Sequence, residues 1–246
     1  MVTTALWASG ATCVVTLGGG FIALRLRAHR GLVYAFSAGA LVAAALMEVV
    51  PNALTLLDES GTSLTPHHLL LACTLGFLCF YLLEQTTHGG VVDDDAAHHA
   101  HTHPACLWGA AGIGVHSFLD GFAIGQAFQA GGEVGGAIGL GVLLHKVADG
   151  VSAVGIMLGS QHTVAMTRTV LLAVAGAPIA GVLLQQVIGM SPPVFSLMLG
   201  WFAGVFLYLG ATSLLPTAHE VSRSRWLPLA TLIGAAVIYL AHWLAE

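Results

Sequence analysis

The chain has 246 residues, of which 57% are hydrophobic and only 8% are charged, and its formal net charge at pH 7 is -5. Soluble globular domains carry about a quarter charged residues, so this composition excludes an ordinary soluble domain and indicates a membrane protein. The 31 glycines and many alanines suit transmembrane helices whose backbones approach one another closely.

Apolar stretches of about 20 residues, the length that crosses a bilayer as a helix, recur along the whole chain. We predict eight such spans and an all-α polytopic membrane protein, with residues 1–246 forming a single transmembrane domain. The first span lacks the basic region that precedes the apolar core of a signal peptide, so we expect it to be retained. The predicted spans are roughly residues 5–25, 32–57, 67–87, 106–129, 134–159, 164–189, 194–219 and 226–245.

The basic residues predict the orientation of the bundle. Six of the 7 Lys and Arg residues lie in the connections after the first, fifth and seventh spans, which face the same side if there are eight spans. Cytoplasmic loops are enriched in Lys and Arg, so this side is predicted to be cytoplasmic and both termini to lie outside. The six are Arg25, Arg27, Arg30, Arg168, Arg223 and Arg225, whereas Lys146 falls within a span.

The connection after the third span, residues 88–105, is predicted to be a cytoplasmic loop rich in His and Asp. Such a low-complexity tract can bind zinc, nickel or copper. Two interpretations remain open: a specific site that captures metal, and a solvated linker that binds cations without selecting among them. The histidines of the loop are His88, His98, His99, His101 and His103, and the aspartates are residues 93–95.

The fourth and fifth spans contain the same phrase, a histidine followed four residues later by Asp-Gly. The first phrase runs from His116 to Gly121 and the second from His145 to Gly150. Residues four apart share one face of a helix, so each phrase presents an imidazole and a carboxylate together. Ionisable groups are costly to hold in hydrocarbon, so two matched pairs need a reason beyond packing. Binding of a divalent cation is the simplest such reason.

A short glycine-rich connection makes the fourth and fifth spans antiparallel neighbours. Counted from the outer ends of the two spans, Asp120 and His145 lie equally deep, so they should face each other. His116 should meet Asp149 in the same way, one turn further in. This predicts a ring of two imidazoles and two carboxylates, which suits Zn, Fe, Mn or Co better than Ca, Mg or Cu(I). A structural His–Asp bridge and a proton relay are the alternatives. The glycines that end the phrases can let helices approach closely or let the backbone deform beside the site.

Other polar groups can extend a path for the ion. Glu48 lies well within the second span. His219 and Glu220 end the seventh span at the predicted cytoplasmic mouth, where they either receive a departing ion or form an ordinary solvated helix terminus. Three spans contain prolines that are predicted to kink or break their helices. These prolines are Pro51, Pro178 and Pro216.

At these residues the sequence resembles the ZIP family (Zrt-, Irt-like proteins) of divalent metal transporters. The likeness covers the eight spans, the outside termini, the His-rich connection and, most specifically, the two phrases, in which the family carries Glu where this chain has Asp. The resemblance implies an exit role for His219 and Glu220. The main transport site that it implies consists of His116, Asp120, His145 and Asp149.

Some family members have a second metal position beside the first. Ser117, Lys146 and Ala177 stand at what look like the corresponding places, and none is a convincing metal ligand. The ammonium of Lys146 can fill the space of a second cation and pair with Asp120 or Asp149. The resemblance therefore implies a site for a single metal ion.

The expected function is uptake of a divalent transition metal, above all Zn2+, from the outside to the cytoplasm, and the inward direction comes from the resemblance alone. The sequence has no P-loop phrase for ATP, so ion gradients or cytosolic metal binding should drive transport. The metal is the substrate, and no cofactor is expected. The expected partners are the ion and the lipid bilayer of the plasma (inner) membrane, without nucleic acid, and packing of small residues is compatible with a monomer or a homodimer.

The alternative function is a membrane-embedded zinc-dependent hydrolase. In such an enzyme three protein ligands hold zinc and leave an open position for water. His116, His145 and one of the two aspartates can supply the ligands, and the other aspartate the general base. A hydrolase turns over a substrate without metal flux, whereas a carrier moves metal without turnover.

Overall fold

The computed structural model describes residues 2–88, 104–159 and 162–245, and the regular secondary structure within these ranges is entirely helical. Within the described residues, eight helical segments are long and apolar enough to cross a membrane, which confirms the predicted all-α class and number of spans. The elements are α1 (Val2–Arg25), η1 (Arg27–His29), α2 (Arg30–Ala43), η2 (Ala44–Val49), α3 (Val50–Glu59), α4 (Pro66–His88), α5 (Pro104–Ala130), α6 (Gly132–Gly159), α7 (Val164–Gln185), α8 (Pro192–Tyr208), η3 (Leu209–Leu214), α9 (Leu215–Val221) and α10 (Leu227–Ala245).

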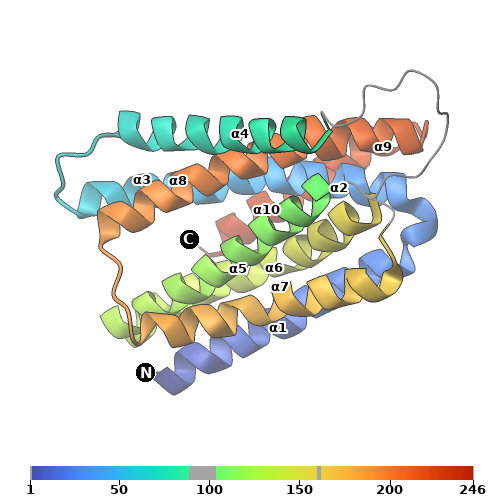
Figure 1. The fold of residues 1–246 in the computed structure, drawn as a ribbon. Helices are drawn as coiled ribbons and strands as arrows, with labels where there is room; N and C mark the ends of the chain where they lie inside the picture. The colour runs from blue at the N-terminus through green and yellow to red at the C-terminus, as the bar shows by residue number, and fades with distance from the viewer. Residues whose placement is uncertain (1, 89–103, 160–161, 246) are drawn as a thin grey trace.

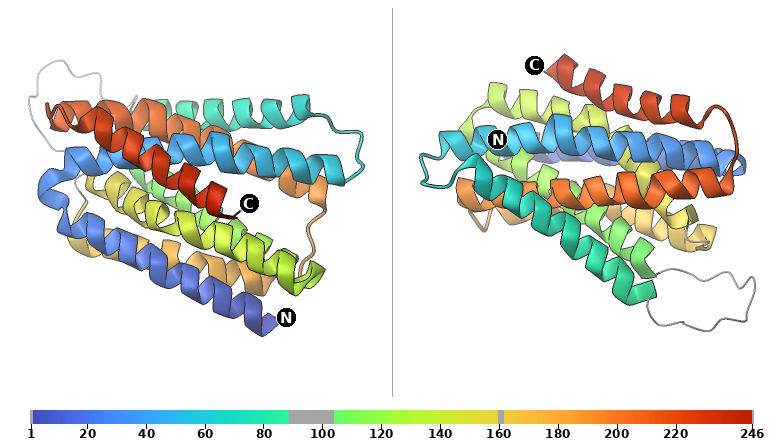
Figure 2. Two further views of the ribbon diagram at one scale, coloured as in Figure 1. Left: turned by 180° about the vertical axis from the view of Figure 1, so that it is seen from behind. Right: turned by 90° about the horizontal axis from the view of Figure 1, so that it is seen from above.

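The helices form one bundle in which α5 and α6 lie side by side in the interior (Figure 1). Helix α5 packs against α7 and α6, and α6 also packs against α1, α2 and α10. Helix α4 lies at the edge against α8, and α10 covers α2 and α6 from the opposite side (Figure 2). The two central helices carry the repeated phrases, so the bundle surrounds the predicted site with other helices.

Both chain ends lie toward the end of the bundle that holds the α3–α4 and α7–α8 connections (Figure 1). At the opposite end lie Arg25, the last residue of α1, Arg168, in the first turns of α7, and Arg223 and Arg225, in the connection before α10. The side of the membrane that each end faces stays a prediction. The His-rich loop, with His98, His99, His101 and His103, lies outside the described residues.

Two spans contain a turn of π-helix immediately before a proline. In η2 the backbone N–H of Val50 donates to the carbonyl oxygen of Ala45, and Pro51 follows. In η3 the N–H of Leu215 donates to the carbonyl of Gly210, and Pro216 follows. A proline ring clashes with the preceding turn of an α-helix, and a π-turn widens that turn. The expected distortion therefore takes the form of local widening, and the α-helix resumes at the residue before each proline.

Gly121 and Gly150 permit close approach of helices, as one of the two predicted roles requires. A Cβ atom on Gly121 would collide with the backbone carbonyl of Pro178 in α7. A Cβ atom on Gly150 would collide with the backbone of Thr16 in α1. Helix α7 continues through Pro178, so the proline predicted to disrupt this helix packs against α5 instead.

The substitution Gly121→Ala is expected to lower the midpoint of thermal unfolding in detergent. The added methyl group overlaps the Pro178 carbonyl, and overpacking of this kind costs about 1–3 kcal/mol. Gly176→Ala on α7 is the matched control, because a Cβ atom there meets no neighbour within 4 Å. The control should be neutral or stabilising, since alanine favours a helix over glycine. Equal midpoints for the two variants would contradict the close packing of α5 on α7.

Candidate metal site

Four buried side chains from the repeated phrases come together between α5 and α6. Each offers one metal-binding atom, and these four atoms all lie within 4.8 Å of one another. The predicted convergence of the two phrases is confirmed in this geometric sense. We call the set the four-residue group; it consists of His116, Asp120, His145 and Asp149.

Asp120 is the carboxylate that both histidines approach. Its Oδ2 atom lies 3.3 Å from Nε2 of His116 and 3.5 Å from Nε2 of His145. The predicted facing of Asp120 and His145 is therefore confirmed. Among the described residues, His116 lies within ion-pair distance of Asp120 on its own helix and not of Asp149, with which it was predicted to pair. Oδ2 of Asp149 instead lies 4.0 Å from Nε2 of His145.

Lys146 is fully buried and lies between the two aspartates. Its Nζ atom donates to Oδ2 of Asp120, to Oδ2 of Asp149 at 2.6 Å and to Oγ of Ser117 at 3.0 Å. The expected pairing with Asp120 or Asp149 is thus confirmed for both. Burying a charge is tolerable when it is paired and hydrogen-bonded, and this ammonium meets both conditions.

Two imidazole nitrogens of the four-residue group are buried without a hydrogen-bond partner among the described residues. They are Nδ1 of His116 and Nε2 of His145. Buried polar atoms are almost always paired, and an ion held by the group would give a partner to Nε2 of His145, which lies 3.5 Å from Oδ2 of Asp120. Two nitrogen and two oxygen donors are a set that tetrahedral zinc accepts. The chemistry of the group therefore fits a divalent transition metal.

The structure places the other predicted site residues in two different settings. Glu48, in η2, lies behind His145, with its Oε1 atom 2.6 Å from Nδ1 of that histidine. His219 and Glu220 are exposed in α9, and Nδ1 of His219 lies 2.9 Å from the carbonyl oxygen of Leu215. The structure does not bring these two residues into the four-residue group.

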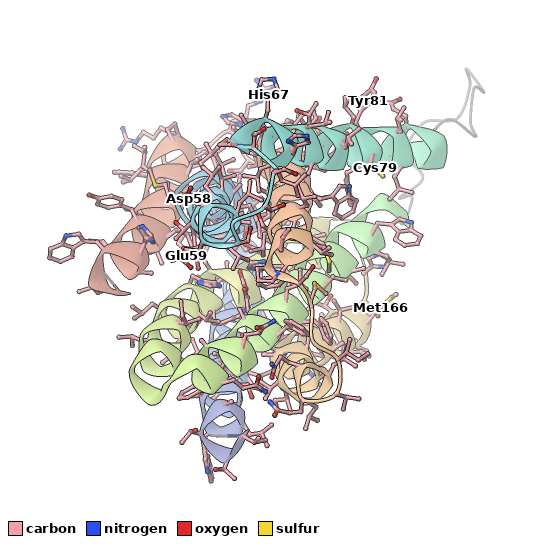
Figure 3. The ribbon with its side chains drawn as sticks, turned by 90° about the vertical axis from the view of Figure 1, so that its left-hand side faces the viewer. Asp58, Glu59, His67, Cys79, Tyr81 and Met166 are labelled. Carbon is pink, nitrogen blue, oxygen red and sulfur yellow. The ribbon has the colours of Figure 1, made fainter. Side chains whose placement is uncertain are left out.

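A cavity of about 560 Å3 runs from the four-residue group toward the end of the bundle that holds both termini. His116, Asp120 and Glu48 line its inner part. Near helix ends, its walls include Glu59 of α3 and His242 of α10. Figure 3 looks along the bundle from this end and shows Glu59 beside Asp58 at the end of α3.

Sequence reasoning named Glu48 but missed the rest of the polar face of the second span that lines this cavity. It consists of Glu48, Asn52, Thr55 and Glu59. Their successive spacings of four, three and four residues are those of one helix face, and this was the signal in the sequence. The face supplies oxygen atoms between the mouth of the cavity and the four-residue group.

Comparisons with known proteins found a matching family and several relatives. Residues 93–241, more than half of the chain, match the family described as "ZIP Zinc transporter". "IAA-alanine resistance protein 1" of Arabidopsis thaliana is 33% identical over 112 residues, which are 45% of this chain and 24% of that protein. "Zinc transporter ZIP4" of Homo sapiens is 30% identical over 117 residues, which are 47% of this chain and 18% of that protein. The alignments thus span about a quarter or less of these relatives' own lengths.

Proposed function

The chain belongs to the ZIP zinc transporter family, and from this membership we propose that it carries a divalent transition metal, above all Zn2+, from the outside to the cytoplasm. Eight apolar helices make it a multi-pass membrane protein, and the plasma membrane is its proposed location. The family consists of transporters and not of enzymes, which argues against the hydrolase alternative.

The observation that carries this proposal is the buried four-residue group on two adjacent spans. Its members are proposed to replace most of the water around the ion, and their four donor atoms lie within 4.8 Å of one another. Ionisable residues within spans are rare and mark ion pathways by default. Mixed imidazole and carboxylate donors favour zinc and its neighbours among the transition metals. The name of the human relative, a zinc transporter, supports the same choice.

The cavity supports entrance of the ion from the outer side. It reaches His116 and Asp120 from the end of the bundle opposite the end at which Arg25 and Arg168 lie. By the positive-inside rule the arginine-rich end is cytoplasmic, so the cavity mouth faces outward. The proposed exit then passes His219, Glu220 and the His-rich loop at the other end, after the bundle has rearranged.

Lys146 supports a site for a single ion. Its ammonium already occupies the space beside both aspartates, where a second divalent cation would need ligands. Ser117, which stands at another candidate position, is hydrogen-bonded to the same ammonium at 3.0 Å. One zinc ion at the four-residue group is the expected stoichiometry.

Uptake of 65Zn into proteoliposomes tests the proposed function directly. Purified wild-type protein should give saturable uptake without ATP, and unlabelled zinc should compete with it. Saturable flux of another divalent ion without zinc flux would change the proposed substrate and keep the carrier. No flux of any divalent metal, with protein shown to be folded and inserted, would end the carrier proposal.

The orientation of the cavity can be tested with Thr55→Cys in a chain whose own cysteines are replaced by serine. Thr55 is exposed and lines the cavity, so a membrane-impermeant maleimide applied from outside intact cells is expected to label it. Ser224→Cys, in the connection before α10, should be labelled only after the membrane is permeabilised. The opposite pattern would invert the proposed topology.

A further inference from the structure

The outer nitrogen of His145 is held by a carboxylate from a different span. Nδ1 of His145 lies 2.6 Å from Oε1 of Glu48 and 3.2 Å from the carbonyl oxygen of Gly141. Carboxylate and carbonyl oxygens are acceptors, so Nδ1 carries a proton in this arrangement. The lone pair of the neutral imidazole is then on Nε2, the buried nitrogen without a hydrogen-bond partner that lies 3.5 Å from Asp120.

We propose that Glu48 is a positioning residue that turns His145 toward the metal, and that it is not itself a ligand. The inference rests on the proposed function. Histidines that bind metals usually donate their other N–H to a carboxylate or a carbonyl, which fixes the tautomer and the ring orientation and makes the binding nitrogen more basic. Glu48 stands in this relation to His145 and lies outside the four-residue group.

The π-turn η2 explains how Glu48 reaches this position. The turn comprises Ala44–Val49, and it adds one residue to the helix relative to a regular α-helical turn. The two residues before Glu48, Leu46 and Met47, are exposed. Glu48 itself is only partly exposed and faces α6. A carboxylate within a span is costly without a partner, and His145 supplies that partner.

His116 has no equivalent support from a carboxylate. Its Nδ1 atom is buried without a hydrogen-bond partner among the described residues. Its ring instead packs edge-on against Phe206, with 4.7 Å between ring centroids. Changes at Glu48 should therefore act on the metal through one imidazole and leave the other in place.

The test compares zinc binding to the purified full chain with Glu48→Leu, which removes the acceptor, and Glu48→Gln, which keeps an acceptor without charge. The zinc Kd, measured by competition with a fluorescent chelator, should weaken about 10- to 100-fold in Glu48→Leu and less in Glu48→Gln. X-ray absorption at the zinc edge should show two imidazole ligands in the wild type and in Glu48→Gln, and one in Glu48→Leu. Asp58→Asn is the matched control, because Asp58 is an exposed carboxylate on the same span outside the cavity lining.

Three results would overturn the inference. The first is wild-type affinity with two imidazoles in Glu48→Leu, including the case in which only its thermal stability falls. The second is loss of one oxygen ligand with both imidazoles kept in Glu48→Gln and Glu48→Leu, since Glu48 would then be a ligand. The third is a wild-type chain that binds no zinc. A wild type that binds zinc but transports no divalent metal would end the carrier proposal and leave the role of Glu48 standing.

Discussion

Asp120→Ala is expected to reduce 65Zn uptake at limiting zinc by at least about 100-fold, because loss of a ligand should exceed the 10- to 100-fold effects seen for residues that support ligands. One oxygen of this carboxylate approaches both His116 and His145. His145→Ala should have a similar effect, since it removes the nitrogen that faces two carboxylates. Both variants are compared with the wild type in proteoliposomes of equal protein content.

The fold should survive the change at Asp120. In Asp120→Ala the ammonium of Lys146 keeps Asp149, at 2.6 Å, and Ser117, at 3.0 Å, as partners, so no buried charge is left alone. Asp58→Ala, which removes an exposed carboxylate, is the control and should transport zinc like the wild type. Wild-type uptake by folded and inserted Asp120→Ala would show that the ion takes another route.

The number of spans and the convergence of the two phrases could be predicted from the sequence because both follow from local periodicity. Apolar length sets a span, and a spacing of four residues places each His and Asp on one helix face. A short connection then makes α5 and α6 neighbours. These rules put His145 opposite Asp120, where the structure has it.

The predicted pairing of His116 with Asp149 differs from the structure, in which His116 lies within ion-pair distance of Asp120. Counting residues from helix ends assumes two straight antiparallel axes, but helices in a bundle cross at an angle. Small offsets then decide which of two carboxylates a ring approaches. Here Asp120 approaches both rings, at 3.3 and 3.5 Å, although Lys146 pairs with Asp120 as well as with Asp149.

The setting of Glu48 could not be predicted, because it depends on contacts between spans far apart in the sequence. Sequence alone places a carboxylate three residues before Pro51, yet it does not say which helix the carboxylate faces. A π-turn shifts the helical register between the residues before it and those after it, so regular spacing counted from the start of the span does not predict the direction that Glu48 faces. The loop with His98 and His103 has no periodicity, and its metal binding stays a prediction.

Lys146→Met is expected to destabilise the metal-free protein and to tighten zinc binding. The change leaves Asp120 and Asp149 buried without their shared counter-ion, and breaking a buried ion pair in this way costs about 3–5 kcal/mol. Zinc then meets the same oxygen atoms without a competing ammonium, so its affinity should rise by about tenfold or more, each factor of ten being about 1.4 kcal/mol.

These two effects have a joint signature in thermal unfolding. Zinc that binds only the folded state raises the unfolding midpoint according to the ratio of its concentration to Kd. Lys146→Met should therefore unfold at a lower temperature than the wild type without zinc and show a larger rise when zinc is added. Arg168→Met, which removes an exposed cation, should change neither quantity.

Lys146→Glu should raise the stoichiometry measured by calorimetry from one zinc ion to two, because a new carboxylate takes the place of the ammonium beside Asp120 and Asp149. A Lys146→Met chain with wild-type stability and zinc affinity would show that the ammonium neither neutralises the aspartates nor competes with the metal.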